Sequence, residues 1–177
     1  MSELTLARAK KGDVKAFEEI ILLYEKLIYS VSYKYMGNAE DAKDVAQESI
    51  LKIYKNISIC KSMDKFKSWA ARITSNTAID FLRKRKVKLE PIDDLPLASP
   101  DLPEETAERN ETLRAVAKAL KMLPEEVRTL IILRDLQGFS YEELAQTLEL
   151  PLGTVKSKLS RARILMRKTL SELEGGI

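Results

Sequence analysis

The sequence has 177 residues, of which 45% are hydrophobic but only 6% aromatic, and a mild formal net charge of +3. This composition allows one ordinary or two small cores and favours helices over sheets. The absence of histidine removes the usual general base and the commonest transition-metal ligand, and the single cysteine, Cys60, excludes an intramolecular disulfide. Since no apolar run is long enough for a membrane span and no signal peptide is recognisable, we expect a soluble, cytoplasmic, non-enzymatic protein without cofactor or metal.

The first strong helix is expected between Asp13, a good N-cap residue, and Gly37, which tolerates the left-handed conformation that ends many helices. Apolar residues recur between them at three- and four-residue intervals, a pattern that predicts a broad buried face. Asn38 is expected to cap a second helix over residues 39–57. Its core face carries Ala42, Ala46, Ile50, Ile53 and Ile57.

The second helix also has an acidic face with one apolar residue, made of Asp41, Asp44, Gln47, Glu48 and Leu51. Its three carboxylates would fit a metal or acid–base site, but no histidine accompanies them. Acidic residues at helical spacing are also common on solvated surfaces. The pattern leaves open a solvated surface or a docking surface for a basic partner.

A third helix is predicted over residues 66–86, after a polar break at residues 58–65. Phe66 and Phe81 occupy apolar positions, and Trp69 is either a core residue or a platform for base stacking. A separate face carries Asn76, Asp80, Arg83 and Lys84. Aromatic residues beside basic ones and an amide are typical of single-stranded nucleic-acid binding.

Residues 87–106 combine four prolines with several acidic residues, which indicates a linker. About 20 extended residues reach ~65 Å, nearly two turns of duplex DNA at ~34 Å each. We therefore expect an all-α chain with two small domains, residues 1–86 and 107–177, that can occupy separated sites on DNA.

The second domain is expected to begin with a helix near Ala107, to break at Pro124 and to continue with a helix from Glu125 to Leu136. Two further helices would follow, and residues beyond Leu170 would fray.

The last two helices form a helix-turn-helix pattern. Ser140 and Glu143 make a capping-box sequence, and Pro151 is expected to start the final helix. Val155 and Leu159 begin the buried stripe of that helix. Residues 151–170 include six Lys or Arg and no acid, which favours a DNA-reading helix over a plain solvated one. Its outward residues are Thr154, Lys156, Ser157, Lys158, Ser160, Arg161 and Arg163.

Three stretches together resemble bacterial RNA polymerase sigma factors of the extracytoplasmic-function group in the sigma-70 superfamily. They are residues 12–57, residues 66–86 (FKSWAARITSNTAIDFLRKRK) and residues 123–170, which contain GFSYEELAQTLELPLGTVKSKLSRARILMR. Their order and spacing are those of the family. The resemblance implies a first domain that docks on core polymerase and opens and reads the minus-ten element, with loop 58–65 capturing a flipped base. It implies a second domain that reads the minus-thirty-five element.

The resemblance also implies residue roles and partners. Contact with the coiled-coil clamp of the largest polymerase subunit is implied for Asp41, Asp44, Gln47, Glu48 and Leu51. Contact with the minus-ten element is implied for Trp69, Asn76, Asp80, Arg83 and Lys84. Contact with the minus-thirty-five element is implied for Lys156, Ser157, Lys158, Ser160, Arg161 and Arg163, with Arg128 and Thr154 on phosphates. The partners are core RNA polymerase and promoter DNA, both duplex and single-stranded, with an anti-sigma factor as a further candidate.

Three other functions compete with this interpretation. A stand-alone helix-turn-helix regulator would bind duplex DNA without polymerase, usually as a dimer on a two-fold site. A protein that mimics a sigma factor to titrate a regulator would not need the basic recognition helix. A metal-dependent enzyme would use Asp41, Asp44 and Glu48. The sequence leaves the arrangement of the two domains in the free protein open.

Overall fold

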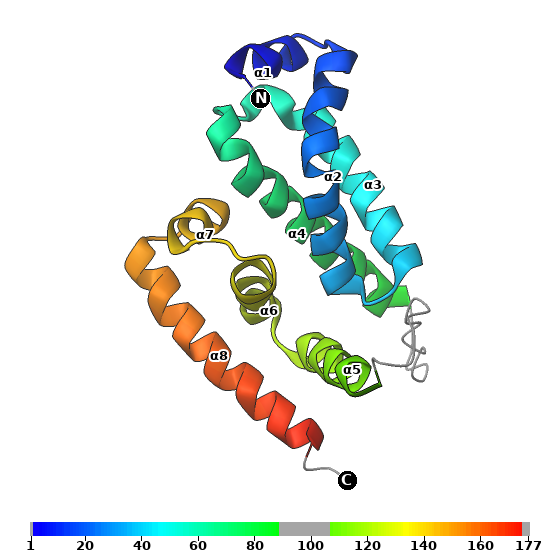
Figure 1. Ribbon diagram of the computed structural model, residues 1–177, viewed down its shortest axis with the longest axis vertical. Coiled ribbons are helices and arrows are strands. Elements are labelled where there is room, and N and C mark those ends of the chain that lie inside the picture. Colours follow the sequence, from blue (N-terminus) through cyan, green and yellow to red (C-terminus); the bar gives the residue numbers. More distant parts are fainter. Residues whose placement is uncertain (1, 89–106, 175–177) are drawn as a thin grey trace.

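The computed structural model describes residues 2–88 and 107–174, and within these ranges the chain forms helices and no strand (Figure 1). The first unit contains α1 (Glu3–Lys10), α2 (Val14–Met36), α3 (Ala39–Asn56), the 3₁₀ turn η1 (Ile57–Ile59) and α4 (Met63–Lys88). The second contains α5 (Ala107–Met122), α6 (Glu125–Ile131), the π-helical η3 (Ile132–Leu136), α7 (Tyr141–Leu148) and α8 (Leu152–Glu174). The predicted all-α class is confirmed. The expected linker falls largely on residues 89–106, outside the described ranges.

The first two predicted helices have the ends that their cap residues indicate. The Asp13 carboxylate accepts a hydrogen bond from the Ala16 backbone N–H at 3.1 Å, and α2 ends at Gly37 with φ of 76°. The Asn38 side chain accepts from the backbone N–H of Asp41 at 2.9 Å and starts α3. These caps satisfy backbone groups that a helix end otherwise leaves open.

Helix α1 was not expected, and it changes where α4 begins. Leu6 and Ala9 of α1 are buried in the core of the first unit. The Glu3 carboxylate accepts a hydrogen bond from the backbone N–H of Met63 at 2.7 Å. Because this remote side chain satisfies the first turn of α4, the helix starts at Met63, inside the stretch expected to be a polar break.

The capping box before α7 is confirmed. The Glu143 N–H donates to the Ser140 hydroxyl at 3.0 Å, and the Ser140 N–H donates to the Glu143 carboxylate at 2.7 Å. Helix α8 starts at Leu152, one residue after Pro151, whose carbonyl accepts from Val155 N–H at 3.0 Å.

Helix α8 is longer than expected. It continues to Glu174 instead of fraying after Leu170. Buried Thr169 and partly buried Leu170 and Leu173 hold its last turns. The expectation of fraying was wrong because these residues pack against a hydrophobic cluster formed by other helices, which the local sequence does not reveal.

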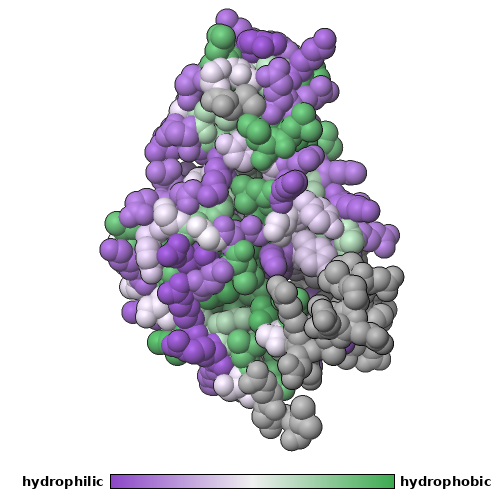
Figure 2. All heavy atoms as spheres, viewed as in Figure 1, coloured by the Kyte–Doolittle hydropathy of each residue, from purple (hydrophilic) through white to green (hydrophobic). Residues whose placement is uncertain are grey.

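Of the two buried hydrophobic clusters in the described residues, one is formed by both helical units. Tyr35 and Ala78 from the first unit belong to the same buried cluster as Leu130, Phe139 and Leu144 from the second. Helix α4 packs against α7, as Figure 1 shows. On the face in Figure 2, hydrophobic side chains gather along the middle of the molecule between hydrophilic ones. The free chain is therefore compact in this structure.

Polar contacts also join the units. The Tyr35 hydroxyl and the Thr129 hydroxyl lie 2.7 Å apart, and the Gln137 side-chain amide donates to the Ser30 hydroxyl at 2.7 Å. Burial raises the pKa of Tyr35, which keeps its hydroxyl neutral and available for this hydrogen bond.

Candidate nucleic-acid interface

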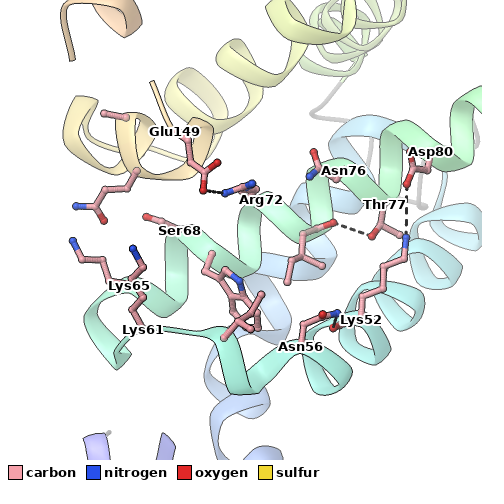
Figure 3. A pocket seen from close by; sticks show the side chains of 15 residues that line it. Lys52, Asn56, Lys61, Lys65, Ser68, Arg72, Asn76, Thr77, Asp80 and Glu149 are labelled. Carbon is pink, nitrogen blue, oxygen red and sulfur yellow. Dashed lines mark hydrogen bonds and ion pairs between the residues drawn. The ribbon is translucent and has the colours of Figure 1, made fainter. Parts of the chain in front are cut away.

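A basic cleft of about 750 Å³ opens on the surface of α4 (Figure 3). Its walls come from four places: the end of α3, the loop before α4, one face of α4 and the end of α7. The lining residues are Lys52, Asn56, Ile59, Lys61, Lys65, Ser68, Trp69, Arg72, Ile73, Asn76, Thr77, Asp80, Ala145, Gln146 and Glu149. The cleft thus combines cations, amides and one indole, the groups that hold single-stranded nucleic acid.

Trp69 lies in this cleft rather than wholly in the core. Its side chain is partly buried, and its ring meets Phe66 edge-on at a centroid distance of 5.7 Å, whereas Phe66 is fully buried. Phe66 therefore supports the indole from behind. The sequence left open whether Trp69 is a core residue or a platform for base stacking. Its place in the cleft is compatible with stacking on a base.

The predicted minus-ten residues divide into two groups. Asn76 and Asp80 line the cleft with Trp69, and Asp80 lies 3.9 Å from the Lys52 ammonium group. Arg83 lies outside the cleft and donates to both Glu125 carboxylate oxygens, at 3.0 and 2.5 Å. Lys84 is exposed, also outside the cleft.

The four cations that line the cleft are not among the residues predicted from the sequence. Lys61 and Lys65 come from the segment before and at the start of α4, Lys52 comes from α3, and Arg72 lies one turn before Asn76. The sequence signal for these cations is the basic excess of residues 61–90, but it does not show that they lie on one surface.

The acidic face of α3 is largely exposed. Asp44, Gln47 and Leu51 are open to solvent, and Leu51 is 59% exposed although it is a large apolar residue. Glu48 is partly buried and pairs with Lys52 at 3.0 Å. Within the described ranges, no cluster of three potential metal-binding residues occurs.

Asp41 differs from the other predicted members of this face. Its carboxylate is 20% exposed, accepts from the Asn38 amide at 2.7 Å and pairs with Arg85 of α4 at 2.5 Å. Asp41 therefore fastens α3 to α4 at the edge of the face.

Helix α8 presents the basic surface that its sequence predicts. Lys156, Ser157, Ser160 and Arg161 are exposed, whereas Val155, Leu159 and Ala162 are buried. Arg167 and Lys168, which are not among the predicted contacts, are also exposed and extend this surface. The neighbouring Ile164 is 57% exposed.

Three predicted members of the α8 surface are held by contacts within the second unit. Lys158 pairs with Glu126, and Arg163 pairs with Asp135, with its Nε 3.0 Å from the carboxylate. The Asp135 carboxylate raises the pKa of Arg163 above its ordinary value, so its positive charge is secure. Thr154 is partly buried, and its carbonyl accepts from the Ser157 hydroxyl at 3.0 Å.

Arg128 does not occupy the position expected for a phosphate contact. It is only 6% exposed, and its guanidinium donates to the carbonyls of Leu120 at 2.7 Å, Lys121 at 2.8 Å and Leu123 at 3.0 Å. Leu120 and Lys121 lie in the last turn of α5 and Leu123 follows it, where a helix leaves carbonyls without partners of its own. The structure therefore corrects the predicted role, since Arg128 caps a helix and its donors face inward.

Comparison with known proteins supports both helical units. Residues 20–87 match sigma-70 region 2, and residues 113–166 match sigma-70, region 4. The ECF RNA polymerase sigma factor SigW of Bacillus subtilis is 32% identical, over 98% of each chain. The ECF RNA polymerase sigma-E factor of Escherichia coli is 31% identical, over 91% of this chain and 90% of the relative.

Two solved structures have a similar fold. CnrH, in complex with the cytosolic domain of CnrY, superposes with a TM-score of 0.71 over 96% of this chain and 97% of the other, at 23% identity. The sigma factor RpoE of Bartonella quintana, in complex with the anti-sigma factor NepR, gives a TM-score of 0.65 over 89% and 98%, at 26% identity. Within the described ranges, no helix is both long and apolar enough to cross a membrane. By its near-full-length similarity to SigW and its two matched regions, the chain belongs to the extracytoplasmic-function group of sigma-70 RNA polymerase sigma factors.

Proposed function

We propose that this chain acts as an alternative sigma factor through three separate surfaces. The first domain, residues 1–86, would dock on core polymerase and hold the minus-ten element. Residues 107–177 would read the minus-thirty-five element, with residues 87–106 as the linker. One observation carries this proposal. A chain of this family has an exposed acidic face on α3, a basic cleft beside it and a basic surface on α8.

The polymerase surface consists of Asp44, Gln47, Glu48 and Leu51. Its negative charge fits a basic partner helix, and exposed Leu51 provides an apolar contact at its C-terminal end. Charge complementarity of this kind favours a correct partner and speeds association. Asp41 contributes indirectly, because its pair with Arg85 fixes the angle between α3 and α4.

The cleft on α4 is the proposed site for unpaired minus-ten bases. Trp69 offers a stacking surface, Asn76 offers both donor and acceptor groups, and Lys61, Lys65 and Arg72 can neutralise strand phosphates. Holding a base there offsets an unstacking cost of a few kcal/mol. Arg83 and Lys84 would meet the DNA beyond the cleft.

Helix α8 is the proposed minus-thirty-five reader. Lys156, Ser157, Ser160 and Arg161 lie on its exposed face near the N-terminal half, where recognition helices usually contact base edges. Lys158 and Arg163, which are paired with acids in the free chain, and Thr154 at the start of the helix would complete the phosphate contacts.

The remaining assignments follow from this mechanism. No covalent step is proposed for this chain, since the polymerase performs the chemistry, and the place of action would be the cytoplasm, where that polymerase works. Because CnrH and RpoE were solved with regulatory partners, an anti-sigma factor is a proposed partner here.

The polymerase surface can be tested by binding to bacterial core RNA polymerase. The variant D44K/E48K should bind labelled core enzyme about tenfold or more weakly, because reversed charges face a basic partner. The variant E18K/E19K changes the same charge on exposed residues of α2 and should bind normally. Equal binding by all three proteins would contradict the docking role. A stand-alone regulator would instead bind duplex DNA as a dimer and ignore core enzyme.

A further inference from the structure

Ile164 lies at the centre of the exposed basic surface of α8. Its side chain is 57% exposed, although it is a large apolar residue. On the surface of a helix, the nearest neighbours of a residue are those three and four positions away on either side. For Ile164 these four neighbours are all exposed and all polar or cationic: Ser160, Arg161, Arg167 and Lys168. An apolar side chain is therefore surrounded by groups that suit the phosphates and base edges of a duplex.

This surface faces away from the packed side of α8. Helices α5, α6 and α7 pack against α8, and Figure 1 shows α8 at the edge of the molecule. The packed side carries Val155, Leu159 and Ala162, which are all buried. Ile164 does not belong to that stripe, so the fold of the second unit does not explain an apolar residue at this position.

Ile164 continues the line of residues proposed to read bases. Four residues stand at positions i, i+3, i+4 and i+7, and thus on one face of the helix: Ser157, Ser160, Arg161 and Ile164. Recognition helices that lie in the major groove can contact bases with this same spacing. Seven residues advance ~10.5 Å along a helix, about three base pairs at ~3.4 Å each. Ile164 would therefore meet the base pair about three steps beyond the one at Ser157.

The charges of α8 show how far along the helix a duplex can lie. Residues 151–170 contain no acid, and the next acid is Glu172, more than two turns beyond Ile164. Glu172 lies 3.8 Å from Lys168. Because an acid would repel phosphates, the acid-free stretch marks the part of α8 that suits contact with DNA. Ile164 lies inside that stretch.

The chemistry of isoleucine favours one group in the major groove. The side chain neither donates nor accepts hydrogen bonds, so it cannot read a base edge by that means. Among the four bases, thymine presents a methyl group in the major groove. A β-branched side chain has few χ1 rotamers, so Ile164 loses little conformational freedom when it meets that methyl group.

We propose that Ile164 is a specificity-determining residue of the minus-thirty-five reader and selects a thymine through its 5-methyl group. This inference rests on the proposed function of α8 and names the base that one of its side chains selects. The contact removes apolar surface of both groups from water. Burial of one methyl-sized group is worth about fourfold in binding.

Replacement of thymine by deoxyuridine tests the contact, since it removes the 5-methyl group and keeps every hydrogen-bonding group of the base. The minus-thirty-five element is first taken from the templates of a random promoter library that core RNA polymerase and the full chain transcribe. Each thymine of that element is then replaced in turn.

At one thymine, wild type should favour the thymine template over the deoxyuridine template about fourfold when the two compete for limiting holoenzyme. At the same position, I164A should favour it by less than about 1.5-fold. Equal preferences of wild type and I164A at every thymine, or a selected element without thymine, would overturn the proposal.

Two further variants separate this contact from the general effect of an exposed apolar residue. L113A shortens Leu113 of α5, which is 53% exposed, and should keep the full preference for thymine. I164V keeps a β-branched apolar side chain and should retain a preference of about twofold or more. Loss of the preference in L113A as well as in I164A would refute the role of Ile164.

The two proposals fail by different results. If transcription depends on the protein but I164A keeps the thymine preference, the sigma function stands and the role of Ile164 fails. If neither wild type nor any variant supports transcription from the library, the sigma function fails, and the role of Ile164 fails with it because there is no element to read.

Discussion

Arg128 illustrates why a basic residue in a DNA-reading domain need not contact DNA. Its guanidinium donates three hydrogen bonds to carbonyls at the C-terminal end of α5. Burial lowers the pKa of Arg128 because it disfavours the charged form, and these carbonyls provide partners for that charge. The resemblance to the family implied a phosphate contact for Arg128, but it covers the whole region and does not show where a single side chain points. The direction of one side chain depends on α5, which lies outside the helix-turn-helix.

The variant R128L should lose about 2–4 kcal/mol of unfolding free energy, because buried carbonyls would lose their donors. Urea unfolding measures this change. The control R161L, on exposed Arg161, should keep stability within about 0.5 kcal/mol but reduce the salt dependence of duplex binding by about one phosphate. If R128L kept its stability and instead reduced the salt dependence, the phosphate role would return.

Glu143 connects a local cap with the interface between the units. Partial burial alone would raise its pKa, but hydrogen bonds from Lys67 and from the Ser140 N–H outweigh this effect and hold the pKa below its usual value. A carboxyl group with a lowered folded-state pKa stabilises the fold above its unfolded pKa. That stabilisation is lost as the pH falls through the folded-state value.

The difference in unfolding free energy between wild type and E143Q should therefore be present at neutral pH. It should shrink as the pH falls below about 4.3, the ordinary pKa of a glutamate, and should disappear once acid has protonated the carboxyl group in the folded protein as well. Urea titrations of both proteins across this range give the difference directly. A difference that stays constant or grows with acid would show that the ionised carboxylate is not the stabilising form.

Helix ends were predictable where the cap lies close in sequence. Asp13, Asn38 and Ser140 all accept the local hydrogen bonds that their positions indicate. Helix α1 and the true start of α4 were not predictable, because Glu3 caps Met63 from sixty residues away in the chain. Similarly, the stripe of Ala71, Ala78 and Leu82 on α4 has an obvious purpose only once the second unit is in place.

Removal of the remote cap tests this explanation of α4. E3A should lower the unfolding free energy by about 1 kcal/mol, the usual cost of a lost N-terminal cap. E3Q keeps an oxygen acceptor and should lose less. Hydrogen exchange at the first turn of α4 should rise in E3A before other regions respond. Equal stability of E3A and wild type would mean that the hydrogen bond to Met63 contributes nothing.

The surfaces of the whole molecule differ in how far the sequence predicts them. The acidic face of α3 and the basic face of α8 were readable from sequence, since each follows a helical period. The cleft was only partly readable, because its walls come from α3, α4 and α7. The packing of the two units against each other could not be predicted from the sequence, since ion pairs such as Arg72 with Glu149 join residues that no sequence spacing relates.

The most direct measurement is run-off transcription by bacterial core RNA polymerase on a promoter library with random sequence and variable spacers, with and without this protein. We predict transcripts that depend on the protein and come from templates sharing two fixed elements at one spacing, nearly two turns apart at ~34 Å per turn. No protein-dependent transcript, combined with a shift of duplex DNA by the protein alone, would contradict the sigma function and favour a stand-alone regulator.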